Sequence, residues 1–260
     1  MPENLVTRHV VSAVLLWALL TAVGEATIFL DWFPTVGSHE AEDFDRIFLI
    51  LVAMGMPVFA FVIAVLAYAM LNFRSVDREE TGATFLGVGT GPRVWVGLTA
   101  ALAVFVMIFP GMTGLAALNK ERSGNGWGEY DAELVVHAIG YQWFWEFEYP
   151  ESGISVKGAG NELVLPVDTV IRFDVDAADV LHSYWIPAFR MKIDAVPGRT
   201  TFFTVKPTTE GNFNDDTAFR VQCAELCGLD HSGMQFPVRV VSQQEFKDWV
   251  DSKTVAAKGQ

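Results

Sequence analysis

The chain carries two long runs of apolar residues that contain no charge. Residues 47–71 and residues 94–118 each extend for 25 positions without Asp, Glu, Lys or Arg. A helix of about 20 apolar residues crosses the hydrocarbon core of a bilayer, so both runs predict transmembrane helices rather than buried helices of a soluble protein. Pro57 and Pro110 lie inside the runs. We expect each proline to kink its helix, because it removes a backbone hydrogen bond.

A third apolar stretch, residues 10–30, has two interpretations. It is long enough for another span, but Ala22-Val23-Gly24 also resembles the small-residue cleavage site of a secretory signal. We favour a retained span, which makes residues 1–120 a membrane anchor with three helices. Glu25 would then lie near one membrane face.

The charges of the connecting segments predict the orientation of this anchor. Residues 72–93 contain three arginines, whereas residues 31–46 are acidic and contain one. Positively charged loops stay on the cytoplasmic side of a membrane. We therefore expect a multi-pass protein of the cell (inner) membrane, with residues 72–93 in the cytoplasm and residues 121–260 on the periplasmic or outer side.

From about residue 130 the apolar pattern changes to alternation, which is typical of strands. Aromatic side chains at every second position predict one strand over 141–149 with an aromatic face: Tyr141, Trp143, Trp145, Phe147 and Tyr149. Further strand-like runs occur at 162–165, 169–175, 200–206, 217–222 and 236–241. Short strands separated by turns predict an all-β sandwich or barrel. The predicted terminal helix, residues 243–251, follows a capping box, Ser242 to Glu245.

One loop of this β domain gathers unusual chemistry. It reads Cys223-Ala-Glu-Leu-Cys227-Gly-Leu-Asp-His231-Ser-Gly-Met234 and holds the chain's two cysteines. Thiolate, imidazole and thioether ligands together suit copper. Two thiolates can each bridge two metal ions, so the loop predicts a dinuclear copper site. His182, at a predicted strand end, is the candidate for a second histidine ligand.

Two other interpretations of the loop exist. A Cys-x3-Cys pair outside the cytoplasm can form a local disulfide. A zinc site would use cysteine, histidine and carboxylate, and would leave Met234 without a role. The complete set of soft ligands favours copper over both.

The β domain is acidic. Residues 121–260 contain 21 Asp and Glu against 12 Lys and Arg, a net charge of −9. Such a surface repels nucleic acid and anionic lipid and attracts cationic proteins. An ordinary acidic surface without a partner would show the same count. We therefore expect no nucleic-acid partner.

Four segments of the chain, taken in their order and spacing, match a known family of proteins. They are Gly140-Tyr-Gln-Trp-Phe-Trp145, Asp179-Val-Leu-His-Ser-Tyr-Trp-Ile-Pro187, Asp194-Ala-Val-Pro-Gly-Arg199 and the cysteine loop. With the membrane spans, they resemble subunit II of the haem–copper cytochrome c oxidases. The resemblance implies a cupredoxin fold that holds a dinuclear CuA centre. It also implies that electrons come from cytochrome c or a similar carrier and pass to haem in subunit I, where oxygen is reduced to water.

The resemblance further implies a role for each matching residue. Six would hold copper: Cys223 and Cys227 as bridges, His182 and His231 as one ligand to each copper, Met234 and the carbonyl of Glu225 as weak ligands. The Glu225 side chain would bind magnesium or manganese at the contact with subunit I. Trp143 would mark the point where the electron enters from the donor. The loop from Asp194 to Arg199 would pack on subunit I, beside other oxidase subunits and membrane lipid.

The chain also departs from this family. Gly91-Pro92-Arg93 stands where the family often has a glutamate at a proton-channel mouth. A third span would be an addition to the usual two. Two other functions fit part of the pattern: quinol oxidase subunit II, which lacks the two thiolates, and a membrane-anchored copper chaperone of thioredoxin type. Such chaperones place Cys-x3-Cys after an early strand of an α/β pattern, whereas here the pair lies late in an all-β domain.

Overall fold

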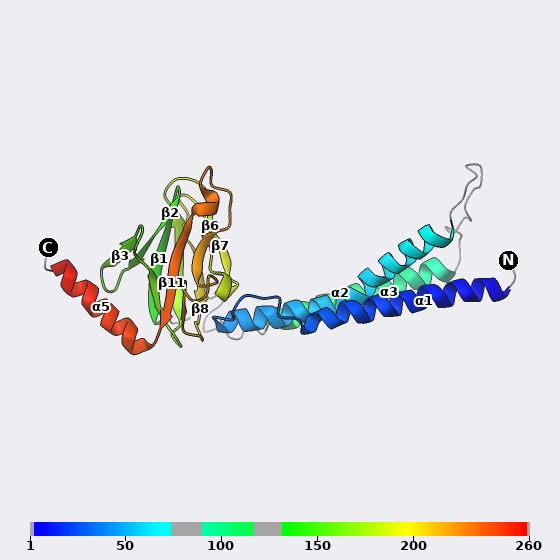
Figure 1. The fold of residues 1–260 in the computed structure, drawn as a ribbon. Coiled ribbons are helices and arrows are strands. Elements are labelled where there is room, and N and C mark those ends of the chain that lie inside the picture. Colours follow the sequence, from blue (N-terminus) through cyan, green and yellow to red (C-terminus); the bar gives the residue numbers. More distant parts are fainter. Residues whose placement is uncertain (1–2, 74–89, 117–131, 259–260) are drawn as a thin grey trace. The chain divides into compact units, whose positions relative to one another are not determined.

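The computed structural model describes residues 3–73, 90–116 and 132–258 (Figure 1). Most of the loop predicted to be cytoplasmic, residues 74–89, and the end of the span predicted at 94–118 lie outside this description. The contacts divide the chain into two compact units. One unit comprises Met1–Trp32 and Arg46–Ala117, and the other comprises Phe33–Asp45 and Leu118–Gln260.

Long helices dominate the first unit. They are α1 (Glu3–Ala26), followed by the short η1 (Thr27–Phe29), then α2 (His39–Asn72), α3 (Thr90–Val106) and η2 (Met107–Met112). Three segments within the described residues are long and apolar enough to cross a membrane: Thr7–Phe29, His39–Asn72 and Thr90–Ala116. The predicted series of apolar N-terminal helices is therefore confirmed.

The two prolines act differently. Pro57 lies inside α2, which continues through it. Its carbonyl accepts a hydrogen bond of 2.8 Å from Trp17 Nε1 on α1. At Pro110 the helix is interrupted, because Phe109 has extended backbone angles, φ −133° and ψ 119°. The ring of a proline disfavours the helical conformation in the residue before it, which explains the break at Phe109.

The second unit is a β-sandwich, which confirms the predicted all-β domain. Among the described residues, one sheet has the strand order β3-β2-β1-β5-β8, and the other has the order β4-β11-β10-β6-β7 with β9 paired to β11. The strands are β1 (Leu134–Tyr141), β2 (Phe144–Tyr149), β3 (Ile154–Lys157), β4 (Leu163–Pro166), β5 (Ile171–Ala177), β6 (His182–Trp185), β7 (Lys192–Ala195), β8 (Thr201–Val205), β9 (Gly211–Asn212), β10 (Arg220–Cys223) and β11 (Gln235–Val241).

The aromatic strand predicted at 141–149 is in fact the end of one strand and the whole of the next. The chain turns at Gln142–Trp143, and Tyr141 pairs with Phe144 across the β1–β2 hairpin. Trp145 and the residues after it keep the predicted alternation, and Trp145, Phe147 and Tyr149 are fully buried. Trp143 lies instead in the turn. The alternation of side chains continues across the tight turn, so periodicity alone did not reveal it.

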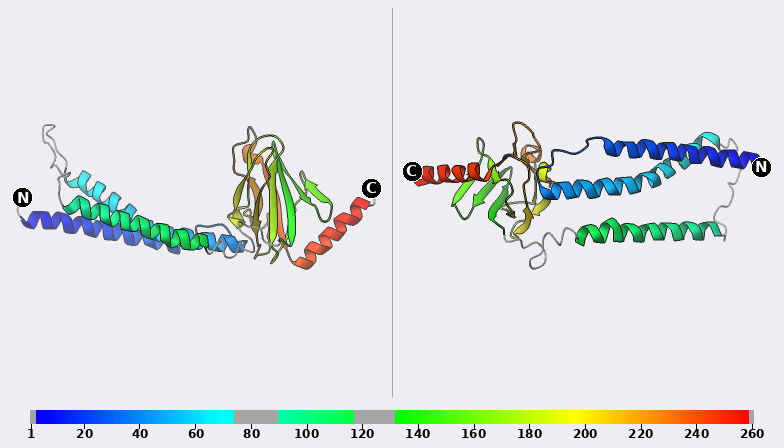
Figure 2. Two further views of the ribbon diagram at one scale, coloured as in Figure 1. Left: turned by 180° about the vertical axis from the view of Figure 1, so that it is seen from behind. Right: turned by 90° about the horizontal axis from the view of Figure 1, so that it is seen from below.

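The C-terminal helix closes one end of the core. α5 (Gln243–Lys258) is longer than predicted and forms one red helix beside the sandwich (Figure 2). Ser242 Oγ accepts a hydrogen bond of 3.2 Å from the Glu245 backbone N–H, as the capping box predicts. Phe246 and Trp249 stand one turn apart and pack against the core ring of Tyr149.

The segment before α2 is tied to the sandwich. The Gly37 N–H donates to Ala188 O at 2.9 Å, and the Thr208 N–H donates back to Gly37 O at 3.0 Å. The His39 N–H donates to Lys206 O at 3.0 Å. Backbone bonds of this kind fix residues 33–45 as part of the β domain, although they precede β1 by about a hundred positions in the sequence.

Arg190 holds this segment most firmly. Its Nε and Nη2 bond the two carboxylate oxygens of Asp45 at 2.8 and 2.7 Å. The remaining donors bond the carbonyls of Thr35, Pro187 and Pro34. All five N–H groups of the guanidinium therefore have acceptors. The Arg190 side chain is only 7% exposed, and a buried charge is costly unless its donors are hydrogen-bonded.

Replacing Arg190 with lysine should therefore destabilise the sandwich although the charge is kept. An ammonium group cannot reproduce the planar fork, so we expect a loss of about 2–3 kcal/mol in the free energy of unfolding. Arg239→Lys is the matched control, because Arg239 makes more exposed ion pairs with Glu162 and Glu245 and should cost under about 1 kcal/mol. Denaturant titration of the full chain measures both, and equal losses would contradict the assignment.

Candidate metal centre

The cysteine loop is held by three strands. Cys223 ends β10 and pairs with Tyr184 of the neighbouring β6. The Cys223 N–H donates to Met234 O at 3.1 Å, and the Ala224 N–H donates to Ser183 O at 2.9 Å. These bonds bring His182, the first residue of β6, beside the first cysteine. Residues 41 positions apart in the sequence thus meet at one end of the sandwich.

The structure brings the predicted ligand atoms together in two groups. Cys223 Sγ lies 3.8 Å from His182 Nδ1 and 3.3 Å from the carbonyl oxygen of Glu225. Cys227 Sγ lies 3.6 Å from His231 Nδ1 and 3.7 Å from Met234 Sδ. The two sulfur atoms are 3.7 Å apart and link the groups. His182, Cys223 and Cys227 form the cluster of metal-binding type found among the described residues.

The local disulfide considered from the sequence is not formed. Both cysteines are free, and their separation of 3.7 Å far exceeds the roughly 2.05 Å of an S–S bond. A thioether beside a thiol and an imidazole also differs from the usual donor set of zinc. Two thiols, each with its own imidazole and one weak donor, fit a pair of soft metal ions that share both sulfurs.

The site is dry. His182 and Met234 are fully buried, and the cysteines are exposed by no more than 4%. Burial, followed by the contact with Cys223, raises the pKa of the Cys227 thiol to about 12. The thiol therefore keeps its proton in the metal-free chain, and a metal must displace that proton to bind.

A carboxylate holds the far side of the His182 ring. Asp179 Oδ1 lies 2.9 Å from His182 Nε2, and Oδ2 accepts a hydrogen bond of 2.7 Å from the Gln142 N–H. Partial burial raises the pKa of Asp179, but the bonds from His182, Gln142 and Val180 together outweigh it, so the pKa is lowered. The ionised carboxylate thus fixes the ring so that Nδ1 faces the sulfur of Cys223.

The β1–β2 turn covers the second cysteine. Gln142 Nε2 and Trp143 Nε1 both donate to the carbonyl of Cys227, at 2.7 and 3.3 Å. Gly228, with φ +119°, leaves room for these side chains, because a Cβ there would lie 3.1 Å from Gln142 Nε2. No local pattern predicts these contacts, since the turn itself was predicted as strand.

Space for His182 also depends on one glycine. A Cβ on Gly140 would lie 2.9 Å from His182 Cδ2, closer than real Cβ contacts. Gly140 belongs to the aromatic segment singled out in the sequence, but its own role there was not predicted. The ring of Trp145 borders the same imidazole, 6.0 Å away between centroids.

The other predicted site residues lie as follows. Trp143 is in the turn beside Cys227 and is partly exposed, and the Glu225 side chain is exposed. Asp194 lies on β7 opposite Ser183, next to His182. Arg199 follows in the turn before β8, where its N–H donates to Val196 O at 3.1 Å.

Much of the β domain matches a known family of sequences. The sequence profile described as "Cytochrome C oxidase subunit II, periplasmic domain" matches residues 152–241. The chain is 30% identical to "Cytochrome c oxidase subunit 2" of Metridium senile, over 69% of this chain and 73% of that protein. It is 34% identical to "Probable cytochrome c oxidase subunit 2" of Rickettsia bellii, over 50% of this chain and 53% of that protein.

A solved structure shows the same likeness. The periplasmic domain of subunit II of cytochrome oxidase from Bradyrhizobium japonicum is 38% identical, with a TM-score of 0.44, over 48% of this chain and 96% of that one. The chain thus spans about half the length of the Rickettsia relative and nearly three quarters of the Metridium relative. Its apolar helices followed by a cupredoxin-like sandwich, and the identity over most of the Metridium protein, show that this chain belongs to the family of cytochrome c oxidase subunit II.

Proposed function

We propose that this chain is the electron-accepting subunit of a haem–copper terminal oxidase and holds a dinuclear CuA centre. The observation that carries the proposal is the pair of free thiols, 3.7 Å apart, each with its own imidazole. Cys223 and Cys227 would bridge two coppers, with His182 and His231 as one further ligand each. Met234 and the Glu225 carbonyl would be the weak ligands.

The bound copper pair would supply reversible one-electron chemistry between a donor and the haem of subunit I. The protein's part is to keep the ligands in place, since a carrier works best when its bonds change little. The burial of His182 and Met234 keeps water away from these two ligands. Asp179 and the backbone bonds of Cys223 hold the donor atoms before any metal arrives.

The donor would be a cytochrome c or a similar cationic carrier. Leu226 and Leu229 are 76% and 94% exposed on either side of Cys227, and so give the loop an apolar rim. The net charge of −9 over residues 121–260 would steer a basic partner to it. Apolar contact at the centre with acidic surroundings is the pattern expected of a transient interface.

Stopped-flow oxidation of reduced cytochrome c by the assembled oxidase tests this steering. The Debye length falls from about 10 Å at 0.1 M salt to about 3 Å at 1 M, so the second-order rate should fall steeply as salt rises. A rate independent of salt with a cationic donor would remove the steering argument. An uncharged or permanently bound donor would then replace cytochrome c in the proposal.

The contact with subunit I would lie at Glu225 and at the loop from Asp194 to Arg199. The exposed Glu225 carboxylate is free to bind a magnesium or manganese ion shared with subunit I. Electron paramagnetic resonance of the manganese-grown oxidase checks this role. Glu225→Gln should abolish the signal of bound manganese while leaving the carbonyl of residue 225 in place. An unchanged signal would contradict the proposed role of the Glu225 carboxylate.

We also propose that residues 1–120 anchor the chain in the inner membrane, with residues 121–260 on the periplasmic side. The support is the three apolar helices and the arginines of the loop at 72–93. A Ser75→Cys variant in intact cells should resist labelling by an impermeant thiol reagent and react after permeabilisation. Ready labelling of intact cells would reverse the orientation.

A further inference from the structure

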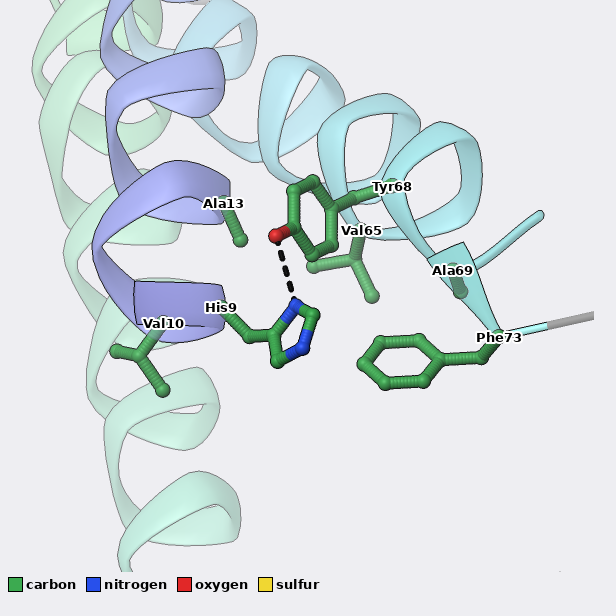
Figure 3. Close-up of a pocket in the computed structure, with 7 residues that line it drawn as sticks. All are labelled: His9, Val10, Ala13, Val65, Tyr68, Ala69 and Phe73. Atoms are coloured by element: carbon green, nitrogen blue, oxygen red, sulfur yellow. Dashed lines mark hydrogen bonds between the residues drawn. The ribbon is translucent and has the colours of Figure 1, made fainter. Parts of the chain in front are cut away.

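The helices α1 and α2 line an open pocket that the electron-transfer role does not use. It has a volume of about 340 Å³, within the range of small-molecule sites. Figure 3 shows side chains from both helices around it. The lining residues are His9, Val10, Ala13, Val65, Tyr68, Ala69 and Phe73. The pocket lies near one end of two segments that are long and apolar enough to cross a membrane.

The pocket is hydrocarbon except for one polar pair. His9 Nδ1 lies 2.9 Å from the hydroxyl of Tyr68. With that hydroxyl as donor, a neutral imidazole carries its own proton on Nε2. No side chain among the described residues bonds Nε2, and Figure 3 shows it on the side of the ring that faces Phe73. One N–H donor is thus presented to an apolar space.

Three rings shape the space around this donor. The ring of His9 lies 5.1 Å from that of Phe73 and 5.9 Å from that of Tyr68, between centroids. The planes are inclined to one another by 49° and 75°, so the rings form a corner rather than a stack. Flat apolar groups pack well against such a corner, and the N–H would fix their orientation.

We propose that this pocket binds an apolar amphiphile whose carbonyl oxygen accepts a hydrogen bond from His9 Nε2. A bare alkyl chain fits the site less well, because it offers the His9 donor no acceptor. Two membrane molecules carry the required carbonyl: a quinone ring, and the ester of a phospholipid. The inference concerns binding alone and is independent of the copper centre.

Photolabelling of the full chain in phosphatidylcholine nanodiscs tests the proposal. One arm uses an azido-benzoquinone with a short alkyl tail, and the other uses a phosphatidylcholine with a diazirine beside its ester. We expect mass spectrometry to place the label on peptides of both helices around residues 9–13 and 65–73. Competition by decyl-benzoquinone in the first arm alone would identify the quinone as the ligand, and labelling in the second arm alone would identify the phospholipid.

The variant His9→Leu should reduce that labelling by about tenfold, the effect of losing one hydrogen bond in a dry site. Tyr68→Phe keeps the ring and removes the hydroxyl that orients the imidazole, so it should give a smaller reduction. Trp17→Phe is the matched control, since it removes another contact between the same helices without altering the pocket lining. Labelling unchanged in His9→Leu, or spread evenly along the helices in both arms, would overturn the proposal. Circular dichroism of each variant in nanodiscs, with a helix content equal to that of the unaltered chain, shows that the helices are folded.

Discussion

Replacing Cys223 with serine is expected to remove the dinuclear copper centre. The sulfur of Cys223 lies between His182 Nδ1, the Glu225 carbonyl and Cys227 Sγ, so its loss removes one of the two predicted bridges between the coppers. Cys227, His231 and Met234 remain together, and they can hold at most one copper. Losing a bridging ligand should weaken binding of the second copper by more than the 10–100-fold that a lost supporting contact costs.

Metal analysis and electron paramagnetic resonance of the purified chain measure this result. The unaltered chain should bind two coppers that share one unpaired electron, and Cys223→Ser should give one copper or none. Met234→Leu is the control: it should keep two coppers and shift only the reduction potential, because the thioether is a weak ligand that tunes it. One copper or zinc per chain in the unaltered protein, or a colourless Cu(I) site, would contradict the dinuclear centre and favour a chaperone.

The ligand set could be predicted from the sequence because most of it is local. Cys223, Cys227, His231 and Met234 lie within twelve residues of one loop, and a single turn of chain brings them together. His182 is distant in sequence, but residues 121–260 contain only two histidines outside the loop. Of these, His182 stands at a predicted strand end, whereas His137 is not at one. In the structure His137 lies instead between the carboxylates of Glu148 and Asp174.

The supporting contacts could not be predicted, since they join residues that share no pattern. Asp179 belongs to a segment quoted from the sequence, but no pattern there indicated that its carboxylate holds His182 and the β1–β2 turn. The turn itself was predicted as strand, because Tyr141 and Trp143 continue the aromatic alternation across it. The bond between Arg190 and Asp45 crosses 145 positions, and neither residue stands in any motif.

Trp143→Gln is expected to slow electron uptake from the donor while leaving the copper centre intact. Trp143 is partly exposed in the turn, and its Nε1 donates to the carbonyl of Cys227. The indole therefore connects the surface directly to a proposed copper ligand, Cys227. Removing it lengthens the path from the donor, so we expect the rate of electron entry to fall.

The copper ligands should tolerate this change, because Gln142 Nε2 still donates to the same carbonyl at 2.7 Å. The copper spectrum and the Kd for cytochrome c should thus stay nearly constant, which separates loss of the electron path from loss of binding. Trp185→Gln is the matched control. This tryptophan of β6 is also partly exposed, but its ring faces the ammonium group of Lys192 on β7, and its side chain makes no hydrogen bond to the cysteine loop among the described residues. Stopped-flow oxidation of reduced cytochrome c compares the two variants. If Trp143→Gln takes up electrons as fast as Trp185→Gln, the electron enters elsewhere on the loop, and the exposed rim formed by Leu226 and Leu229 becomes the next place to test.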